Sequence, residues 1–194
     1  MSAPGGYDND PCVGPTLIGE DELATRLAEL GRQIAADYEG RPPLLVAVLK
    51  GAFLFMGDLA REIDLPLEFD FMAVSSYGAA TKTSGVVRIV KDLDIDLADR
   101  HVLLVEDIVD SGLTLRYLRR NLLARNPASL EVCSLLVREG AEEDQGIRYV
   151  GFRIGDEFVI GYGLDVAERY RNLRRICAYD EEAAVALHAD GAPS

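Results

Sequence analysis

Carboxylates and hydroxyls are concentrated in one short segment near the middle of the chain, residues 102–114, which reads VLLVEDIVDSGLT. Its carboxylates are Glu106, Asp107 and Asp110, and the turn that follows is Ser111, Gly112, Leu113 and Thr114. Carboxylates can accept hydrogen bonds from sugar hydroxyls or bind a divalent cation. Small and hydroxylated residues at the start of a helix present amides and hydroxyls to an anion, which the helix dipole also attracts. The segment therefore predicts a ligand that combines a sugar with a phosphate.

Helix capping is the alternative explanation for these residues. A single Asp, Ser or Thr before a helix usually only caps it. In that alternative Asp110, Ser111 and Thr114 only cap the helix, and Glu106 and Asp107 lie on an exposed strand end. Five polar residues in one strand-to-helix turn behind a buried strand are more than this explanation requires, so we favour the binding site. Other nucleotide-binding patterns are missing from the sequence. It contains no GxxxxGK[ST], and Gly161 and Gly163 are followed by Val166 where GxGxxG needs a third glycine.

The elements that must position this segment alternate along the chain. Apolar runs such as LLVAVL at residues 44–49 are typical of strands buried on both faces, whereas apolar residues at helical spacing predict helices. The predicted strands are 44–49, 67–74, 86–90, 101–105, 131–137, 149–154 and 158–162, with a tight turn at 155–157 joining the last two. The predicted helices are 20–38, 51–63 and 114–125. This order predicts an α/β fold with a mainly parallel twisted sheet flanked by helices, in which ligands bind at the carboxyl ends of the strands.

Composition and charge limit the possible functions. The chain has 194 residues, 48% of them hydrophobic, which predicts one domain with a core over residues 15–178 and flexible tails at 1–14 and 183–194. The formal net charge is −13, and most of it lies near the two ends, so we expect no nucleic-acid partner. No apolar stretch reaches the roughly 20 residues of a membrane helix, and the first residues lack a secretory signal. Three widely spaced cysteines fit reduced thiols, so we expect a cytoplasmic protein with no membrane partner.

A family resemblance begins with VEDIVDSGLT, residues 105–114. It resembles the 5-phosphoribosyl-1-pyrophosphate (PRPP) motif of type I phosphoribosyltransferases and, more narrowly, of hypoxanthine-guanine phosphoribosyltransferases. VLKGAFLFMGDL at 48–59 is similar to the family's pyrophosphate loop, SSYG at 75–78 to its flexible lid, and FVIGYGLDVAERYRNL at 158–173 to its purine-binding and metal-binding end. The resemblance implies the type I fold, with a small hood made by the N- and C-terminal segments, and a homodimer or homotetramer.

The resemblance implies a role for each matching residue on the PRPP side. Glu106 and Asp107 would hold the ribose hydroxyls, directly or through Mg²⁺, and the turn at 111–114 would hold the 5-phosphate. The residues implied to contact the pyrophosphate are Lys50, Gly51 and Arg171, and Asp165 would bind Mg²⁺ beside it. Mg²⁺ is the only cofactor expected. The peptide bond before the loop lysine is often cis in this family, and we expect the same between Leu49 and Lys50.

Further roles follow for the purine side. Phe158 would stack on the purine ring, Val159 would contact its edge through backbone groups, and Asp110 would act as acid or base at N7. Asp165 belongs to the same purine-binding end. The lid is predicted to be a mobile polar loop at 75–85 that excludes water from the activated sugar. Its residues in the family motif include Ser76 and Tyr77.

Arg138 is a departure from the family pattern. It stands in SLLVREG, where the family commonly has a lysine that hydrogen-bonds the 6-oxo group of the purine. Arginine keeps the charge and the donors but has a wider, planar head. We therefore expect Arg138 to bind 6-oxopurines, to reject adenine, and to alter the ranking among hypoxanthine, guanine and xanthine. The alternative is that Arg138 points to solvent and pairs with Glu139 or Glu142.

The implied reaction is Mg²⁺-dependent transfer of 5-phosphoribosyl from PRPP to N9 of hypoxanthine or guanine, giving IMP or GMP and pyrophosphate, in purine salvage. Its expected partners are PRPP and a 6-oxopurine base. Two alternatives stay open: the same reaction on another base such as xanthine, and a regulatory protein that senses PRPP or a purine without turnover. A regulator of that kind would carry a DNA-binding domain, which the acidic residues 1–40 do not resemble. We therefore favour the enzyme.

Overall fold

The structure is a computed structural model that describes residues 7–77, 86–141 and 146–189. The chain divides into two compact units. The larger unit is Thr25–Asp156, and the smaller unit combines Met1–Ala24 with Glu157–Ser194. Within the described residues, no helix combines the length and apolar character that crossing a membrane requires.

The larger unit is built around a six-stranded sheet with the strand order β4-β3-β2-β5-β6-β7. Its strands are β2 (Leu44–Leu49), β3 (Glu68–Tyr77), β4 (Val86–Lys91), β5 (His101–Val109), β6 (Ser129–Arg138) and β7 (Ile147–Ile154). Only β4 is antiparallel to its neighbour; the other four pairs are parallel. The helices are α1 (Glu20–Asp37), α2 (Ala52–Glu62) and α3 (Leu113–Leu123). This arrangement confirms the predicted mainly parallel α/β fold.

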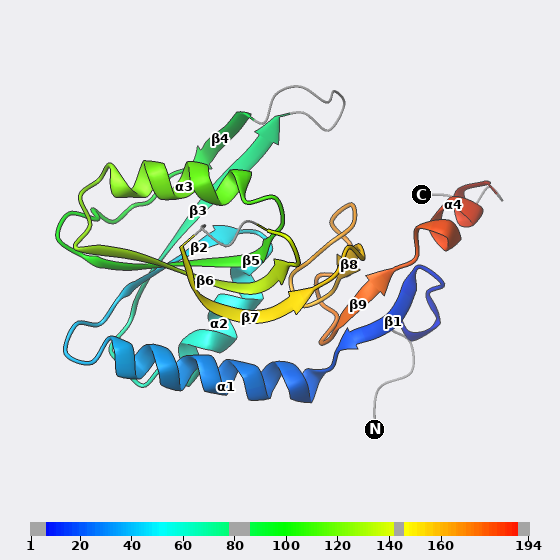
Figure 1. Ribbon diagram of the computed structural model, residues 1–194. Helices are drawn as coiled ribbons and strands as arrows, with labels where there is room; N and C mark the ends of the chain where they lie inside the picture. The colour runs from blue at the N-terminus through cyan, green and yellow to red at the C-terminus, as the bar shows by residue number, and fades with distance from the viewer. Residues whose placement is uncertain (1–6, 78–85, 142–145, 190–194) are drawn as a thin grey trace. The chain divides into compact units, whose positions relative to one another are not determined.

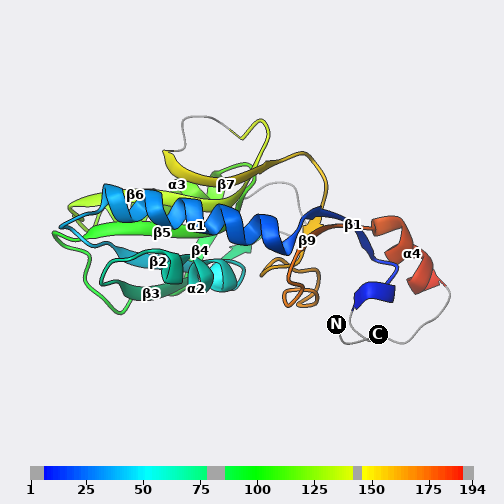
Figure 2. The ribbon, with the colours of Figure 1, turned by 90° about the horizontal axis from the view of Figure 1, so that it is seen from below.

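Helices cover both faces of this sheet (Figures 1 and 2). Alternate residues of β2 point to opposite faces, which is why the whole run LLVAVL is apolar. On one face, Leu44, Val46 and Val48 belong to a core cluster with the buried leucines of α3. The other face is covered by α1 and α2, as the view from below shows (Figure 2). The sheet is therefore held rigidly between two apolar layers, and its strand ends are free to carry polar groups.

Two predicted boundaries shift in ways that affect the site. The strand predicted at 101–105 continues to Val109, so Glu106 and Asp107 lie in the last part of β5 and not beyond it. Ser75 is likewise part of β3, which continues to Tyr77 where a loop was predicted. Pairing with β6 and with β4, respectively, extends these strands past the points where their apolar patterns end.

The smaller unit joins segments from both ends of the chain. Its three-stranded antiparallel sheet has the order β1-β9-β8, formed by β1 (Val13–Ile18), β8 (Val159–Ile160) and β9 (Ile176–Tyr179). A short helix, η1 (Tyr7–Asn9), precedes β1, and α4 (Glu181–Ala189) follows β9. Its core cluster is Cys12, Ile160, Tyr170, Leu173 and Cys177. The predicted hood of N- and C-terminal segments corresponds to this unit.

Three predictions about these segments need correction. The turn at 155–157 does not join a hairpin, because β7 pairs with β6 whereas β8 pairs with β9 in the other sheet. The N-terminal tail predicted for residues 1–14 includes η1 and the start of β1, and Cys12 is buried there. Part of the C-terminal tail predicted for residues 183–194 is helical, since α4 extends to Ala189. The contacts that order these segments join residues far apart in the sequence.

Candidate functional site

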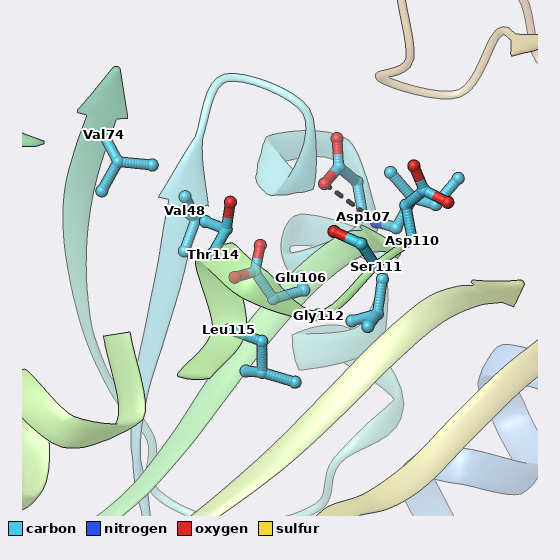
Figure 3. A pocket seen from close by; sticks show the side chains of 11 residues that line it. Val48, Val74, Glu106, Asp107, Asp110, Ser111, Gly112, Thr114 and Leu115 are labelled. Carbon is cyan, nitrogen blue, oxygen red and sulfur yellow. Dashed lines mark hydrogen bonds between the residues drawn. The ribbon is translucent and has the colours of Figure 1, made fainter. Parts of the chain in front are cut away.

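A pocket of about 240 Å³ lies at the carboxyl ends of the central strands of the larger unit. Figure 3 shows Val48 and Val74 on one side of it and Asp110 and Ser111 on the other. The lining residues are Val48, Val74, Glu106, Asp107, Ile108, Val109, Asp110, Ser111, Gly112, Thr114 and Leu115. The structure therefore brings together the carboxylates and hydroxyls singled out in the sequence, at the edge of the sheet where ligands of this fold class bind.

The two adjacent carboxylates of β5 have different surroundings. Glu106 is 5% exposed, and burial, with the charge of Asp107 as a second cause, raises its pKa well above the usual value for a glutamate. Asp107 is partly exposed, and its Oδ1 accepts the Ile108 N–H at 2.9 Å. A cation bound beside Glu106 would favour the ionised carboxylate and so offset the effect of burial on its pKa.

The pyrophosphate loop predicted from the sequence runs close to these carboxylates. Gly51 lies against Asp107 so closely that a Cβ added to Gly51 would be 1.5 Å from Asp107 Oδ2. Lys50 follows the last residue of β2, and the peptide bond between Leu49 and Lys50 is cis, which confirms the expectation for this position. Two of the residues predicted to contact pyrophosphate are therefore placed next to the predicted ribose-binding residues.

The turn at the start of α3 presents backbone groups to the pocket. Gly112 has φ 72°, a left-handed conformation that favours glycine, and it allows the chain to leave β5 and enter α3 within a few residues. The first turn of α3 contains no acidic residue. Its amide groups and the helix dipole therefore favour an anion, as the sequence predicted.

Asp110 and Ser111 also line a second cleft of about 300 Å³. Its other lining residues are Arg138, Glu139, Gly140, Ala141 and Asp156. Arg138 Nε lies 3.0 Å from Asp110 Oδ1, and Arg138 Nη1 donates a hydrogen bond of 2.6 Å to the carbonyl of Gly155. The Arg138 side chain is 17% exposed. It therefore does not point into solvent, as the alternative hypothesis for this residue proposed. Glu142 lies outside the described residues.

Sequence reasoning missed the pairing of Asp110 with Arg138. The strand order would have revealed it, because Asp110 follows β5, Arg138 ends β6, and these two strands are parallel neighbours. In the β5–β6 pair, Val109 is opposite Val137, which places the next residue of each strand at the same edge. Strand order was not predicted from the sequence, and without it the two residues could not be assigned to adjacent strands.

In the smaller unit, Arg171 is held by its own neighbours. Its Nη2 lies 2.8 Å from Asp165 Oδ1, and its Nη1 donates to the carbonyl of Gly163 at 2.7 Å. Its buried Nε has no hydrogen-bond partner among the described residues. Phe158 is 46% exposed, whereas Val159 is buried in β8. An exposed aromatic face beside an ordered strand is compatible with the stacking role predicted for Phe158.

The predicted lid is described only at its beginning. Ser76 and Tyr77 are the last two residues of β3, and their backbones pair with β4. Residues 78–85, which make up the rest of the predicted loop, lie outside the described part of the chain.

The donor set of the pocket is compatible with Mg²⁺. Within residues 7–77, 86–141 and 146–189, no three His, Cys, Asp or Glu side chains are grouped to hold a metal ion by themselves. Mg²⁺ is usually bound by one or two carboxylates together with water and substrate oxygens, which is what Glu106 and Asp107 can offer. Glu106 is buried beside Asp107, and a divalent cation there would offset the charge of two adjacent carboxylates.

Comparison with known proteins gives a consistent family assignment. A model of the phosphoribosyl transferase domain matches residues 19–167. The chain belongs to the phosphoribosyltransferase family. The hypoxanthine-guanine phosphoribosyltransferase of Mycobacterium tuberculosis is 55% identical over 175 residues, covering 87% of each chain. The hypoxanthine phosphoribosyltransferase of Salmonella typhimurium is 50% identical over 160 residues, covering 81% of this chain and 90% of that protein.

Solved structures agree with this assignment. A crystal structure of a hypoxanthine-guanine phosphoribosyltransferase from Bacillus anthracis superimposes with a TM-score of 0.82 at 43% identity, covering 87% of this chain and 99% of the other. A hypoxanthine phosphoribosyltransferase from Staphylococcus aureus gives a TM-score of 0.83 at 41% identity, covering 88% and 94%. The protein is therefore a phosphoribosyltransferase enzyme with the fold that its sequence pattern predicted, and the pocket in β5 and α3 lies in its phosphoribosyltransferase domain.

Proposed function

We propose that this phosphoribosyltransferase acts in purine salvage and transfers 5-phosphoribosyl from PRPP to N9 of hypoxanthine or guanine, with Mg²⁺, giving IMP or GMP and pyrophosphate. The observation that carries the proposal is the shared position of Asp110. It lines both the pocket that contains Glu106 and Asp107 and the cleft that contains Arg138. A sugar-phosphate donor in the first and an acceptor base in the second would meet beside Asp110. The names of the relatives support the choice of purine.

The residues of the first pocket suit the donor. Carboxylate oxygens of Glu106 and Asp107 accept the ribose hydroxyls, and the amides of the turn at 111–114 bind the 5-phosphate. Lys50 and Gly51 hold the pyrophosphate, with Arg171 as a further cation. Mg²⁺, when bound at Glu106 and Asp107, neutralises charge that builds on the leaving pyrophosphate. As pyrophosphate leaves, the ribosyl carbon gains oxocarbenium character, so these preorganised groups stabilise the transition state more than the bound substrate.

The second cleft suits the edge of a 6-oxopurine. N7 and O6 are neighbours on that edge of the ring; N7 carries a proton in the base that reacts, and both atoms are acceptors in the nucleotide product. A group that exchanges a proton with N7 and a donor to O6 must therefore also be neighbours. Asp110 and Arg138, with 3.0 Å between Oδ1 and Nε, meet this requirement. Asp110 accepts the proton from N7 as N9 bonds to the ribosyl carbon, and Arg138 donates to O6. Adenine, whose 6-amino group is itself a donor, is rejected.

The remaining assignments belong to the same proposal. Phe158 stacks on the base, Val159 contacts its edge through the backbone, and Asp165 binds Mg²⁺ on the pyrophosphate side. Ser76 and Tyr77 belong to a lid that excludes water. The enzyme works in the cytoplasm as a homodimer or homotetramer, and one folded phosphoribosyltransferase domain performs the whole reaction.

A panel of bases tests the proposal. Hypoxanthine, guanine, xanthine, adenine and uracil are each incubated with PRPP and Mg²⁺, and pyrophosphate release is measured. We expect turnover of hypoxanthine and guanine and negligible turnover of adenine and uracil. Omission of Mg²⁺ is the control and should abolish the signal. Efficient use of adenine would contradict the assignment to 6-oxopurines, and absence of turnover with every base would contradict the reaction itself.

A further inference from the structure

One guanidinium lies across the ends of three neighbouring strands. The strands β5, β6 and β7 are adjacent and parallel, so their carboxyl ends meet at one edge of the sheet. Arg138 is the last residue of β6, Asp110 follows β5, and Gly155 follows β7. Arg138 bonds to Asp110 through Nε and to Gly155 through Nη1. It therefore ties together the two loops that flank its own strand.

Asp110 and its ion-pair partner Arg138 differ strongly in exposure. Its side chain is 71% exposed, whereas that of Arg138 is 17% exposed. In the described part of the chain, Arg138 supplies the ion pair to the Asp110 carboxylate. An exposed aspartate samples several rotamers, but a group that exchanges a proton must stay within hydrogen-bonding reach of one substrate atom. An ion pair at 3.0 Å with a largely buried cation restricts that motion.

The second bond of Arg138 fixes the cation itself. Its Nη1 donates a hydrogen bond of 2.6 Å to the carbonyl of Gly155, a residue directly after β7. A planar guanidinium can donate in two directions at once from different nitrogens. A lysine at this position would keep the charge beside Asp110 but would have to make both contacts from a single nitrogen. The two contacts together make Arg138 a bridge between Gly155, which follows β7, and Asp110, which follows β5.

We propose that Arg138 is a positioning residue for Asp110, in addition to any contact it makes with the purine. The inference rests on the proposed function, in which Asp110 exchanges a proton at N7. In this role Arg138 acts on the proton transfer indirectly, by holding Asp110 in place. Positioning and purine binding can be distinguished because they change different kinetic constants. Loss of positioning lowers kcat for every purine, whereas loss of a contact to O6 raises KM for the purine.

Variants of Arg138 in two backgrounds separate these effects. Arg138→Met and Arg138→Gln remove the cation, and Arg138→Lys restores it without the second bond. Each change is made in the wild type and in Asp110→Asn, and kcat and KM are measured with hypoxanthine and guanine. Arg153→Met on β7 is the matched control, because Arg153 is exposed. Residues that act as a unit are non-additive in such a cycle.

We expect Arg138→Met and Arg138→Gln to lower kcat about tenfold or more in the wild type, which is part of the hundredfold or more that an acid or base contributes. In the Asp110→Asn background the same changes should lower kcat less than about twofold. Arg138→Lys should recover part of the loss, and Arg153→Met should leave kcat unchanged. An effect confined to the purine KM, or one of equal size in both backgrounds, would overturn the positioning role.

A measurement without substrate keeps this test separate from the proposed function. Hydrogen exchange of the peptide covering residues 106–112 should be faster in Arg138→Met than in the wild type or Arg153→Met, because the Asp110 loop loses its tether. Unchanged exchange would overturn the positioning role even if the enzyme turns over purines. Conversely, faster exchange in a protein that turns over no purine would contradict the reaction while leaving Arg138 as the residue that holds Asp110.

Discussion

Gly51 and Asp107 lie in direct contact, and a Cβ on Gly51 would be only 1.5 Å from Asp107 Oδ2. The contact joins the loop after β2 to the end of β5, which are neighbouring strands. Gly51 has φ −59°, so its backbone conformation is open to any residue. The glycine is therefore required by the space that Asp107 occupies and not by the backbone.

Gly51→Ala should displace the Asp107 carboxylate, because a methyl group cannot share that space. We expect PRPP binding with Mg²⁺ to weaken about tenfold or more, which corresponds to about 1.4 kcal/mol, while the fold is kept. Gly57→Ala in α2, the helix that Gly51 precedes, is the control, since a Cβ there meets nothing within 4 Å. It should leave binding unchanged and stabilise the protein by about 0.5–1 kcal/mol. Calorimetric titration with Mg-PRPP measures the difference, and equal affinities for the two variants would contradict the contact.

Glu106 should make the ligand-free protein less stable as the pH rises. Its pKa in the folded state is raised above the usual 4.5 by burial and by Asp107, so the unfolded chain ionises first. The destabilisation is absent below about pH 4.5 and grows from there until the folded-state pKa is reached. Glu106→Gln should therefore raise the melting temperature at pH 8 and flatten its dependence on pH. It should also weaken PRPP binding.

Melting curves of wild type, Glu106→Gln and the exposed control Glu22→Gln between pH 5 and pH 8 test this, all without ligand. A wild type and a Glu106→Gln variant with parallel pH dependence would show that burial of this carboxylate has no such cost.

Asp110→Asn should separate binding from turnover. The amide keeps the shape of the side chain but cannot accept the N7 proton, so we expect turnover to fall about a hundredfold or more. PRPP affinity should stay within about twofold, because Glu106 and Asp107 hold the ribose. Asp107→Asn should show the opposite pattern, with weaker PRPP binding. Wild-type turnover by Asp110→Asn would exclude Asp110 as acid or base.

Arg138→Lys should change the order of preferred purines. The fork of arginine can span neighbouring acceptors, whereas lysine offers one point donor. We expect the variant to move toward a preference for hypoxanthine and guanine over xanthine, with adenine still rejected. Catalytic efficiencies for the four purines, compared between wild type and variant, measure this. An identical ranking would remove the specificity role of Arg138 and leave its positioning role to the double-variant test.

Tyr170→Phe should destabilise the smaller unit. The Tyr170 hydroxyl donates a hydrogen bond of 3.1 Å to Asp10 Oδ2. The centroids of the Tyr170 and Tyr7 rings are 4.9 Å apart. Loss of the hydrogen bond should lower the free energy of unfolding by about 1 kcal/mol. Tyr117→Phe in α3 is the control. Deletion of residues 1–14 should destabilise the protein more than Tyr170→Phe, because it also removes the buried Cys12. Melting temperatures that match the wild type would show that this segment is dispensable for folding.

The elements of the sheet could be predicted well where the local pattern matches their environment. The run LLVAVL predicted β2 at its observed bounds, because a strand buried on both faces needs apolar residues throughout. The strand β1 was missed, since VGPTLI contains a proline and only one fully buried residue. Its partner is β9, more than a hundred residues away, and no local pattern records such a pairing.

For the site, the sequence by itself determined which residue types are present and in which order: the carboxylates of β5, the turn before α3 and the lysine and glycine after β2. Those chemical properties are local, and a family resemblance could attach roles to them. Only the tertiary structure decided that Arg138 reaches Asp110 and that Gly51 makes room for Asp107. Both contacts join different strands, so they depend on strand order and register, which are set by packing of the whole sheet between its helices.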